Sequence, residues 1–294
     1  MIERYLYADW DEPPEEMSFI KRFDDLISEL RKNLDLILLE LEENNKCTAN
    51  YSPSFYEDIK RIYLLAPALP NVVLNYKICI DFGLPIDPIR YVDFNRKDKN
   101  SNRYTQREKW WADQLFKESL FVAKSAYALS PNCPNALSRF CTKLPEIIKE
   151  SEFTNKKDKY TWQASNPHYV KTLAERINKS IGQPDLIVGA AHGSICPGIL
   201  LSNFLDCELY FIRYSLFKRN DTQPVISEQD KVFLSRHQHG KVILFDEDVV
   251  KGKTLKEFTA QLSPLFEKAY SASVIRHYLS PFCPDFVGEV FYDG

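Results

Sequence analysis

One short segment, Val242–Leu255, joins an apolar run to a pair of acids and then to a Gly-Lys-Thr turn. The run Val242–Phe245 is bounded by charge, which is typical of a buried parallel strand. Such strands present functional groups at their carboxyl ends, where Asp246 and Glu247 are expected. The glycine of Gly252–Thr254 lets a ligand approach the backbone, and the helix that follows offers free N–H groups to phosphate. The segment therefore predicts a sugar-phosphate site on an α/β fold.

This segment resembles the ribose-phosphate signature of the type I phosphoribosyltransferases, in which an apolar strand, two acids and a Gly-x-Thr loop follow one another. In that family the acids hold the ribose hydroxyls of phosphoribosyl pyrophosphate (PRPP), and the loop surrounds its 5-phosphate. The resemblance implies a catalytic role for Asp246 and Glu247 in orienting the ribose. It also implies phosphate binding by the loop residues Val250, Lys251, Gly252, Lys253 and Thr254.

Two positions depart from the family pattern. Val250 occupies the place of an acid that hypoxanthine-guanine phosphoribosyltransferases use as a general base, and Lys251 replaces a threonine. Valine cannot move a proton, so the implied transfer would be slowed without being abolished. A one-residue deletion in the alignment would instead match Glu247 and Asp248 to the two acids, and both registers stay open. The alternative for the whole segment is a surface strand-turn-helix with incidental charge.

A second segment, Asp185–Ser194, also runs from an apolar strand into small residues and a helix. It resembles the pyrophosphate loop of the same family, where a basic residue followed by two glycines ends the first strand. His192, Gly193 and Ser194 occupy those places, and pyrophosphate binding is implied for them. A neutral imidazole offers one donor and no full charge, so we expect weaker or pH-sensitive binding at His192. The alternative is a histidine that ends a strand and has no further role.

A third segment near the C-terminus, Pro284–Gly288, resembles the purine-binding segment of the hypoxanthine-guanine enzymes. In those enzymes an aromatic ring stacks on the base, and the neighbouring backbone reads its edge. The resemblance implies base binding by Phe286 and Val287. The match is short, and the alternative is an edge strand with Phe286 in the core.

The order of patterns predicts two domains: a helical N-terminal domain, residues 1–155, of unknown role, and an α/β phosphoribosyltransferase-like domain, residues 156–294. The C-terminal region alternates strands and helices, which predicts a parallel sheet. Its predicted elements are a helix from Asn166 to Ile181, a strand Leu186–Ala190, a helix through Ile199 and Phe204, a strand Leu209–Leu216, the Val242 strand and a strand Ala272–Tyr278. The polar stretch Lys218–Asp230 corresponds to a mobile hood in the family, with Lys218, Arg219 and Asp221 as its charged residues.

The N-terminal region shows apolar residues at helical spacing. The predicted helices cover Met17–Leu41, Ile59–Leu65, Trp110–Leu129 and Ala136–Ile148. Within them the pair Trp110–Trp111 is expected to lie in a helix core. The segment Arg90–Arg107 is charged and polar, and we expect an exposed loop there.

The composition excludes several partners. The net charge is −3 and the pI is about 6.0, so no global basic field attracts nucleic acid. No apolar run approaches the roughly 20 residues needed to cross a bilayer, and the N-terminus does not resemble a signal peptide. The seven cysteines are scattered without a CxxC pair, which indicates neither disulfides nor a zinc ribbon. We therefore expect a cytoplasmic protein without a membrane partner.

The resemblance implies a protein that binds PRPP or a ribose 5-phosphate nucleotide with Mg²⁺ and transfers phosphoribosyl to or from a nucleobase-type acceptor. Asp246 and Glu247 are expected to act on the ion only indirectly, by orienting the ribose. The alternative is a nucleotide-sensing regulator or a bacterial defence effector without salvage turnover. A third possibility is glycosidic cleavage of a nucleotide by water or phosphate. The helical half is expected to mediate a homo-oligomer or to bind a protein partner.

Overall fold

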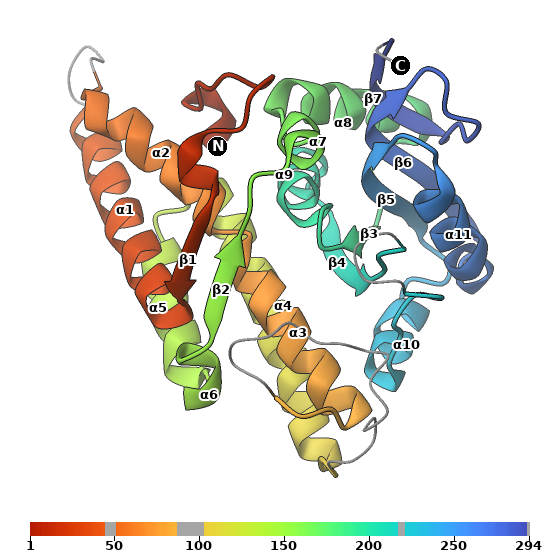
Figure 1. Ribbon diagram of the computed structural model, residues 1–294, viewed down its shortest axis with the longest axis horizontal. Coiled ribbons are helices and arrows are strands. Elements are labelled where there is room, and N and C mark those ends of the chain that lie inside the picture. The colour runs from red at the N-terminus through yellow and green to blue at the C-terminus, as the bar shows by residue number, and fades with distance from the viewer. Residues whose placement is uncertain (45–50, 87–102, 217–220, 293–294) are drawn as a thin grey trace.

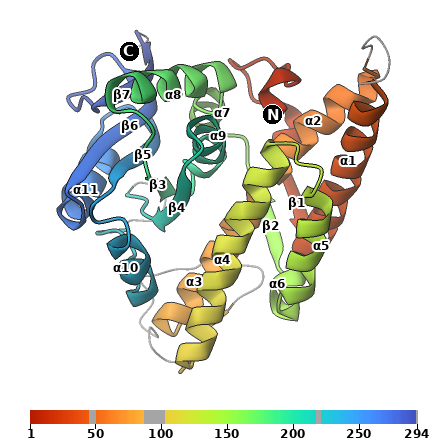
Figure 2. The same ribbon diagram turned by 180° about the vertical axis from the view of Figure 1, so that it is seen from behind.

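The computed structural model describes residues 1–44, 51–86, 103–216 and 221–292. Figure 1 shows a helical half built from the first part of the chain beside a sheet half built from the rest, and Figure 2 shows the same arrangement from behind. The N-terminal residues lie between the two halves, near α7 and the start of α8, and α8 separates them from the C-terminal end in both views. The predicted combination of a helical N-terminal region and an α/β C-terminal region is therefore confirmed. The domain boundary at residue 155 stays a prediction.

The C-terminal half contains a five-stranded sheet in the order β4-β3-β5-β6-β7, with every pair parallel. Its strands are β3 (Leu186–Ala191), β4 (Glu208–Arg213), β5 (Lys241–Val249), β6 (Lys268–His277) and β7 (Phe286–Phe291). The helices are α7 (Lys159–Gln163), α8 (Pro167–Ile181), α9 (Ile195–Leu205), α10 (Glu228–Ser235) and α11 (Lys253–Leu262), with a 3₁₀ turn at Ser263–Leu265. All six residues of β3 are buried, as expected of a strand covered on both faces.

Helix α8 begins where the sequence predicts, with Asn166 as its N-cap. The side chain of Asn166 accepts a hydrogen bond from the backbone N–H of His168 at 3.0 Å, and Pro167 occupies the first helical position. A cap of this kind satisfies one of the free N–H groups at a helix start, and proline is tolerated there because it lacks an N–H. The buried residues of α8 face α9 and the β6–β7 side of the sheet.

The segment after β4 differs from the prediction. β4 ends at Arg213 rather than Leu216, because Arg213 forms an antiparallel bridge with Val225. The Arg213 guanidinium also pairs with Asp221 at 2.9 Å, and both side chains are 1% exposed. The expectation that Asp221 belongs to a solvated, mobile hood is therefore wrong, because this carboxylate is held in a buried ion pair. Lys218 and Arg219 lie outside the described residues.

The N-terminal half is built from helices and one small sheet. The helices are α1 (Phe23–Asn44), α2 (Pro53–Leu65), α3 (Ala68–Phe82), α4 (Gln106–Tyr127), α5 (Cys133–Lys143) and α6 (Glu146–Lys149), with 3₁₀ turns at Ile2–Arg4 and Glu15–Met17. The sheet pairs β1 (Phe19–Arg22) with β2 (Glu152–Asn155) in antiparallel register. Helix α3 was not predicted. Most of the predicted loop Arg90–Arg107 lies outside the described residues, although Gln106 and Arg107 begin α4.

The first predicted helix, Met17–Leu41, begins too early. Residues 19–22 form β1 instead, and Ile20 is 64% exposed although it fits the apolar stripe of a helix. Its strand partner Thr154 comes from β2, more than a hundred residues along the chain. Pairing of this kind cannot be read from a local period, and it overrides a weak helical preference.

Two other helical predictions are corrected. The predicted helix Ala136–Ile148 is divided into α5 and α6, because Pro145 cannot continue a helix. The Trp110–Trp111 pair does not lie in a core, since these side chains are 55% and 37% exposed. The buried stripe of α4 runs through Ala112, Leu115 and Phe116, and both tryptophans fall beside that stripe.

The two halves share a continuous core. The rings of Tyr63 on α2 and Tyr127 on α4 stack with centroids 5.0 Å apart. The Tyr63 hydroxyl donates to the carbonyl of Ser165, just before α8. The Tyr127 hydroxyl donates to the carbonyl of Tyr63 at 2.6 Å and lies 3.2 Å from Cys196 on α9. Buried hydroxyls therefore connect both halves of the chain.

A buried charge network also joins the halves. Lys77 on α3 contacts Asp81 at 2.7 Å, Ser227 at 3.1 Å and Asp230 on α10 at 2.6 Å. Burial lowers the pKa of Lys77, but the charges of Asp230 and Asp81 outweigh it and the net pKa is raised. This lysine is therefore a buried cation between two carboxylates, and it fixes α10 against the helical half.

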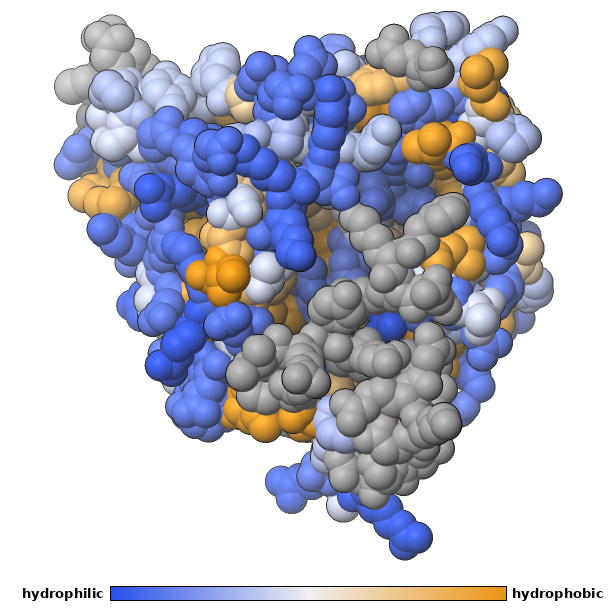
Figure 3. All heavy atoms as spheres, in the orientation of Figure 1, coloured by the Kyte–Doolittle hydropathy of each residue, from blue (hydrophilic) through white to orange (hydrophobic). Residues whose placement is uncertain are grey.

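One stretch, Pro53–Phe82, is long and apolar enough to cross a membrane by length and composition alone. It contains two helices, α2 and α3, and 72% of its most apolar window is buried inside the protein. These helices therefore form core. The face in Figure 3 is largely hydrophilic, with apolar side chains in separate patches.

Candidate functional site

The carboxyl edge of the sheet contains a cavity of about 330 Å³. Two strand-to-helix connections reach it, one from β3 to α9 and the other from β5 to α11. Neighbouring parallel strands end at the same edge, so the topology brings these two segments together although some fifty residues separate them. The cavity is lined by Asp158, Tyr160, Thr161, Ala190, His192, Gly193, Tyr214, Ser215, Leu216, Asp246, Glu247, Asp248, Val250, Lys251, Gly252, Lys253, Thr254 and Leu255.

Strand β5 brings three consecutive acids to this cavity. The strand continues through Asp246, Glu247 and Asp248 as far as Val249, so the acids lie within its last residues rather than after it. Asp246 is 7% exposed, and its Oδ1 accepts a hydrogen bond from the backbone N–H of Glu247 at 3.1 Å. The acids of both alignment registers therefore line the same space.

Crowding and burial change the proton affinity of these acids. Burial, followed by the charge of Glu247, raises the pKa of Asp246 well above its usual value. The same two causes raise the pKa of Asp248 to about 7. His277 at the end of β6 places its Nε2 3.3 Å from Asp248 Oδ1. The site therefore holds an excess of negative charge, which a cation or hydrogen-bond donors would stabilise.

The turn between β5 and α11 is open for an anion. Gly252 adopts a left-handed conformation with φ of 69°, and a Cβ there would collide with Phe282. Gly252 is the N-cap of α11 and has no side chain that could accept a hydrogen bond. The backbone N–H groups of the first turn therefore have no side-chain cap. Lys253 and Thr254 begin the helix, and both line the cavity. A helix start of this kind favours a phosphate.

The connection from β3 to α9 forms the opposite wall. His192 and Gly193 line the cavity, as predicted, and the peptide bond Ala191–His192 is cis. The Glu247 carboxylate lies directly against Gly193, so any side chain at this position would displace it. Ser194 does not reach the cavity. It is fully buried, and its hydroxyl donates to the carbonyl of Ala190 at 2.6 Å.

The structure does not bring Phe286 and Val287 to the cavity. Phe286 is the first residue of β7 and is 9% exposed, with its ring 5.9 Å from that of Tyr270. The carbonyl of Val287 accepts a hydrogen bond from Arg176 on α8 at 2.5 Å. The register places Val287 level with Ser273 and Asp246, but β7 is two strands away from β5, and neither Phe286 nor Val287 lines the cavity.

The sequence did not single out the residues that α7 and the end of β4 supply. Asp158 caps α7 by accepting a hydrogen bond from the N–H of Thr161 at 3.0 Å. Tyr160 lies between these two residues in the chain. Tyr214 donates its hydroxyl to Glu257 on α11 at 2.6 Å. Burial, followed by Glu257, raises the pKa of Tyr214, so its hydroxyl stays protonated. A capping pattern at Asp158 was visible in the sequence, but it carries no sign of a ligand.

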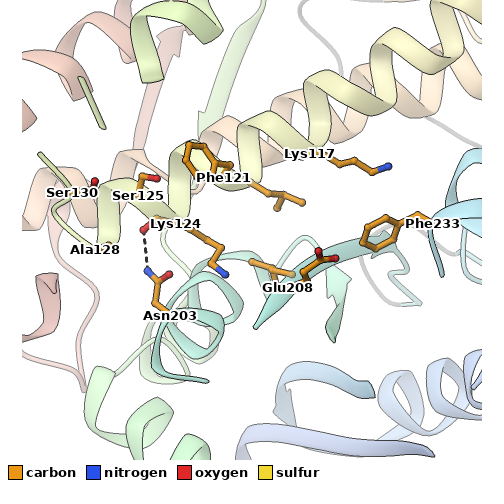
Figure 4. Close-up of a pocket in the computed structure, with 11 residues that line it drawn as sticks. Lys117, Phe121, Lys124, Ser125, Ala128, Ser130, Asn203, Glu208 and Phe233 are labelled. Carbon is orange, nitrogen blue, oxygen red and sulfur yellow. Dashed lines mark hydrogen bonds between the residues drawn. The ribbon is translucent and has the colours of Figure 1, made fainter. Parts of the chain in front are cut away.

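A second cavity, of about 560 Å³, lies where α4 runs alongside α9, β4 and α10 (Figure 4). Lys124 donates to the carbonyl of Cys207 at 2.6 Å, and Lys117 pairs with Asp113 at 2.7 Å. Asn203 donates to the carbonyl of Lys124 at 3.0 Å, as the dashed line in Figure 4 shows. These polar groups are engaged within the protein, and no predicted site residue lines this cavity.

The raised pKa of Asp248 predicts a pH-dependent stability. Its folded-state pKa is about 7, above the ordinary value of 3.8, so the folded protein retains a proton that the unfolded chain has released. The resulting loss in the free energy of unfolding begins near pH 4 and is complete above pH 7. We expect Asp248→Asn to be stabilising, and the gain to grow by on the order of 2 kcal/mol between pH 5 and pH 8. Urea unfolding of the wild type and the variant at pH 5 and pH 8 measures this gain in stability.

Glu150→Gln, at an exposed position, is the control. A gain for Asp248→Asn that does not depend on pH would contradict the raised pKa of Asp248.

No family model and no curated protein matches this chain. Solved structures are similar to its C-terminal part. A purine phosphoribosyltransferase from Pyrococcus horikoshii is 23% identical over 43% of this chain and 83% of its own, with a TM-score of 0.35. The Helicobacter pylori xanthine-guanine-hypoxanthine enzyme is 22% identical, covering 40% and 77%, with a TM-score of 0.32. A hypoxanthine phosphoribosyltransferase from Staphylococcus aureus is 18% identical, covering 44% and 75%, with a TM-score of 0.35. The likeness concerns the arrangement of strands and helices.

Proposed function

We propose that this protein binds PRPP or a ribose 5-phosphate nucleotide with Mg²⁺ and transfers the phosphoribosyl group to or from a nucleobase-type acceptor. The observation that carries the proposal is the meeting of two unlike subsites in one cavity. The open helix start at Gly252–Thr254 suits a phosphate, and the adjacent acids Asp246 and Glu247 suit hydroxyl donors. A ribose 5-phosphate carries both groups at neighbouring positions.

The residues of the cavity have separate roles in this proposal. The first-turn N–H groups of α11, with Lys253 and Thr254, hold the 5-phosphate. Asp246 and Glu247 accept hydrogen bonds from the ribose hydroxyls and face the positive charge that develops on the sugar as the leaving group departs. His192 and Gly193 stand where the pyrophosphate is expected. Catalysis here is positioning and charge stabilisation, since Val250 supplies no base.

The residues fit a magnesium ion that is held mainly by its ligand. The crowded carboxyls, two of which have raised pKa values, form a site short of positive charge. Within the described residues, no group of three or more His, Cys, Asp or Glu forms a cage for a metal. Mg²⁺ prefers few protein carboxylates together with phosphate oxygens, and it would supply neutralisation of the phosphate charge. Asp246 and Glu247 would orient the ribose hydroxyls toward it.

A second candidate is a nucleotide-binding regulator or effector that does not turn its ligand over. Val250 favours it, because this residue is 45% exposed at the cavity and offers no group that can accept a proton. The packing of α10 against the helical half through Lys77 also favours it, since α10 follows the segment that lines the cavity. In this candidate, ligand binding at the cavity would act on the helical half through α10.

Pyrophosphate release distinguishes the two candidates, and a phosphate-loop variant tests the site. Incubation with Mg²⁺, PRPP and each common nucleobase should release pyrophosphate if the protein is a transferase, whereas binding without release supports the regulator. We expect Thr254→Val to weaken PRPP binding about tenfold, because it removes one hydrogen bond to a charged phosphate. Thr259→Val lies farther along the same helix and is the matched control. Equal affinities for the two variants would place the phosphate elsewhere.

A further inference from the structure

An aromatic side chain stands next to the acids at the cavity. Tyr160, on α7, lines the cavity and is 56% exposed. Its ring meets that of His277 edge-on, with centroids 6.1 Å apart and an interplanar angle of 64°. His277 also contacts Phe291, with ring centroids 5.9 Å apart, so the core side of this cluster is packed. Tyr160 thus has a supported ring that is still open to a ligand.

Asp248 lies in the same cluster, between His277 and the cavity. Its side chain is only 9% exposed and lines the cavity. Its Oδ1 is buried and lies 3.3 Å from His277 Nε2, so the histidine orients the carboxyl at the cavity wall. A carboxyl oxygen that faces the cavity can accept a hydrogen bond from a ligand N–H.

The charges around this cluster select the kind of ligand. Asp158, Asp246, Glu247 and Asp248 all line the cavity. Asp158 adds to the negative field at Asp248, as does Glu247. A ring with its own negative charge would be repelled there, whereas a neutral ring that presents N–H groups would be stabilised.

We propose that Tyr160 and Asp248 form the acceptor subsite, in which Tyr160 stacks on a planar nitrogen heterocycle and Asp248 accepts a hydrogen bond from one of its N–H groups. The ligand class is a neutral, N–H-bearing base such as guanine or hypoxanthine, and an anionic base such as orotate is excluded. This inference rests on the proposed function, because it requires a ribose 5-phosphate ligand in the same cavity.

Nucleotides that differ only in the base isolate this subsite. Calorimetry with Mg²⁺ would compare ribose 5-phosphate, guanosine 5′-monophosphate and orotidine 5′-monophosphate on the intact protein. We expect the guanine nucleotide to bind about tenfold or more tightly than ribose 5-phosphate, since base–aromatic stacking is of that magnitude. The orotate nucleotide should gain nothing over ribose 5-phosphate.

Variants of the two residues complete the test. Tyr160→Ala should remove most of the tenfold gain for the guanine nucleotide and leave ribose 5-phosphate binding unchanged, and Tyr160→Phe should keep the gain. Tyr278→Ala is the matched control, because Tyr278 is 58% exposed and does not line the cavity. Asp248→Asn should reduce the preference for the guanine over the orotate nucleotide.

The outcomes separate this inference from the proposed function. If the wild-type protein binds ribose 5-phosphate but Tyr160→Ala retains the full gain for guanine, the subsite is overturned and the proposed function stands. Preference for the orotate nucleotide would also overturn the subsite. If the wild-type protein binds neither ribose 5-phosphate nor PRPP, the proposed function fails, and the acceptor subsite fails with it.

Discussion

Replacing Lys77 by methionine should lower the free energy of unfolding by about 3–5 kcal/mol, because it leaves buried carboxylates without their cation. Lys77 is 1% exposed and contacts Asp81 and Asp230, which are 1% and 6% exposed. Methionine is close in length to lysine, so the loss should report charge rather than a large cavity. Equilibrium unfolding in urea measures the change.

Lys117→Met provides the matched control for this prediction. Lys117 pairs with Asp113 at 2.7 Å, but the lysine side chain is 26% exposed, and Asp113 keeps a second donor in the Tyr210 hydroxyl at 3.2 Å. We expect a loss of about 1 kcal/mol or less, as is usual for partly exposed ion pairs. If Lys77→Met were no more destabilising than Lys117→Met, the buried network would not hold α10 on the helical half.

The double substitution Asp246→Asn with Glu247→Gln should weaken PRPP binding by about 100-fold or more. Two hydrogen bonds from ribose hydroxyls to charged acceptors are lost, and such bonds contribute about 1.5–3 kcal/mol each. The variant should be at least as stable as the wild type, because burial and the neighbouring charge raise the pKa of Asp246 in the folded protein. Loss of binding without loss of stability would therefore report the site itself.

The control for this variant is a pair of adjacent acids outside the cavity. Asp24 and Asp25 lie exposed in the first turn of α1, and Asp24→Asn with Asp25→Asn makes the same change in net charge. Calorimetric titration with PRPP and Mg²⁺ should give wild-type affinity for that control. Equal weakening by the two double variants would mean that net charge, and not ribose recognition, governs binding.

The sequence was sufficient where the cavity is lined by consecutive residues. The passage from β5 through Gly252 into α11 is continuous, so its strand, acids and open helix start could be predicted together. The same holds for β3, His192 and Gly193. Parallel strands end at one edge, which places these two segments in one site without further information.

Contacts between distant parts of the chain could not be predicted in this way. Tyr160 and Tyr214 reach the cavity from α7 and from beyond β4, and no local pattern connects them with β5. The pairing of β1 with β2 likewise joins residues far apart in sequence. Phe286 matched a short motif, but its ring is buried beside Tyr270 on a strand two places from β5, and it does not line the cavity. The sequence named Asp248 only in the alternative register of the acids, and the continuation of β5 past Phe245 carries it into the same cavity.

Titration of the intact protein with PRPP and Mg²⁺ in a calorimeter tests the central claim most directly. We predict saturable binding at one site per chain, with release of protons, because carboxyls whose pKa values are raised in the free protein must ionise to hold the ribose and cation. Repeating the titration in buffers of different ionisation enthalpy measures the released protons. Absence of any binding heat in all of these buffers, for a protein that is folded, would contradict the assignment of a ribose-phosphate site.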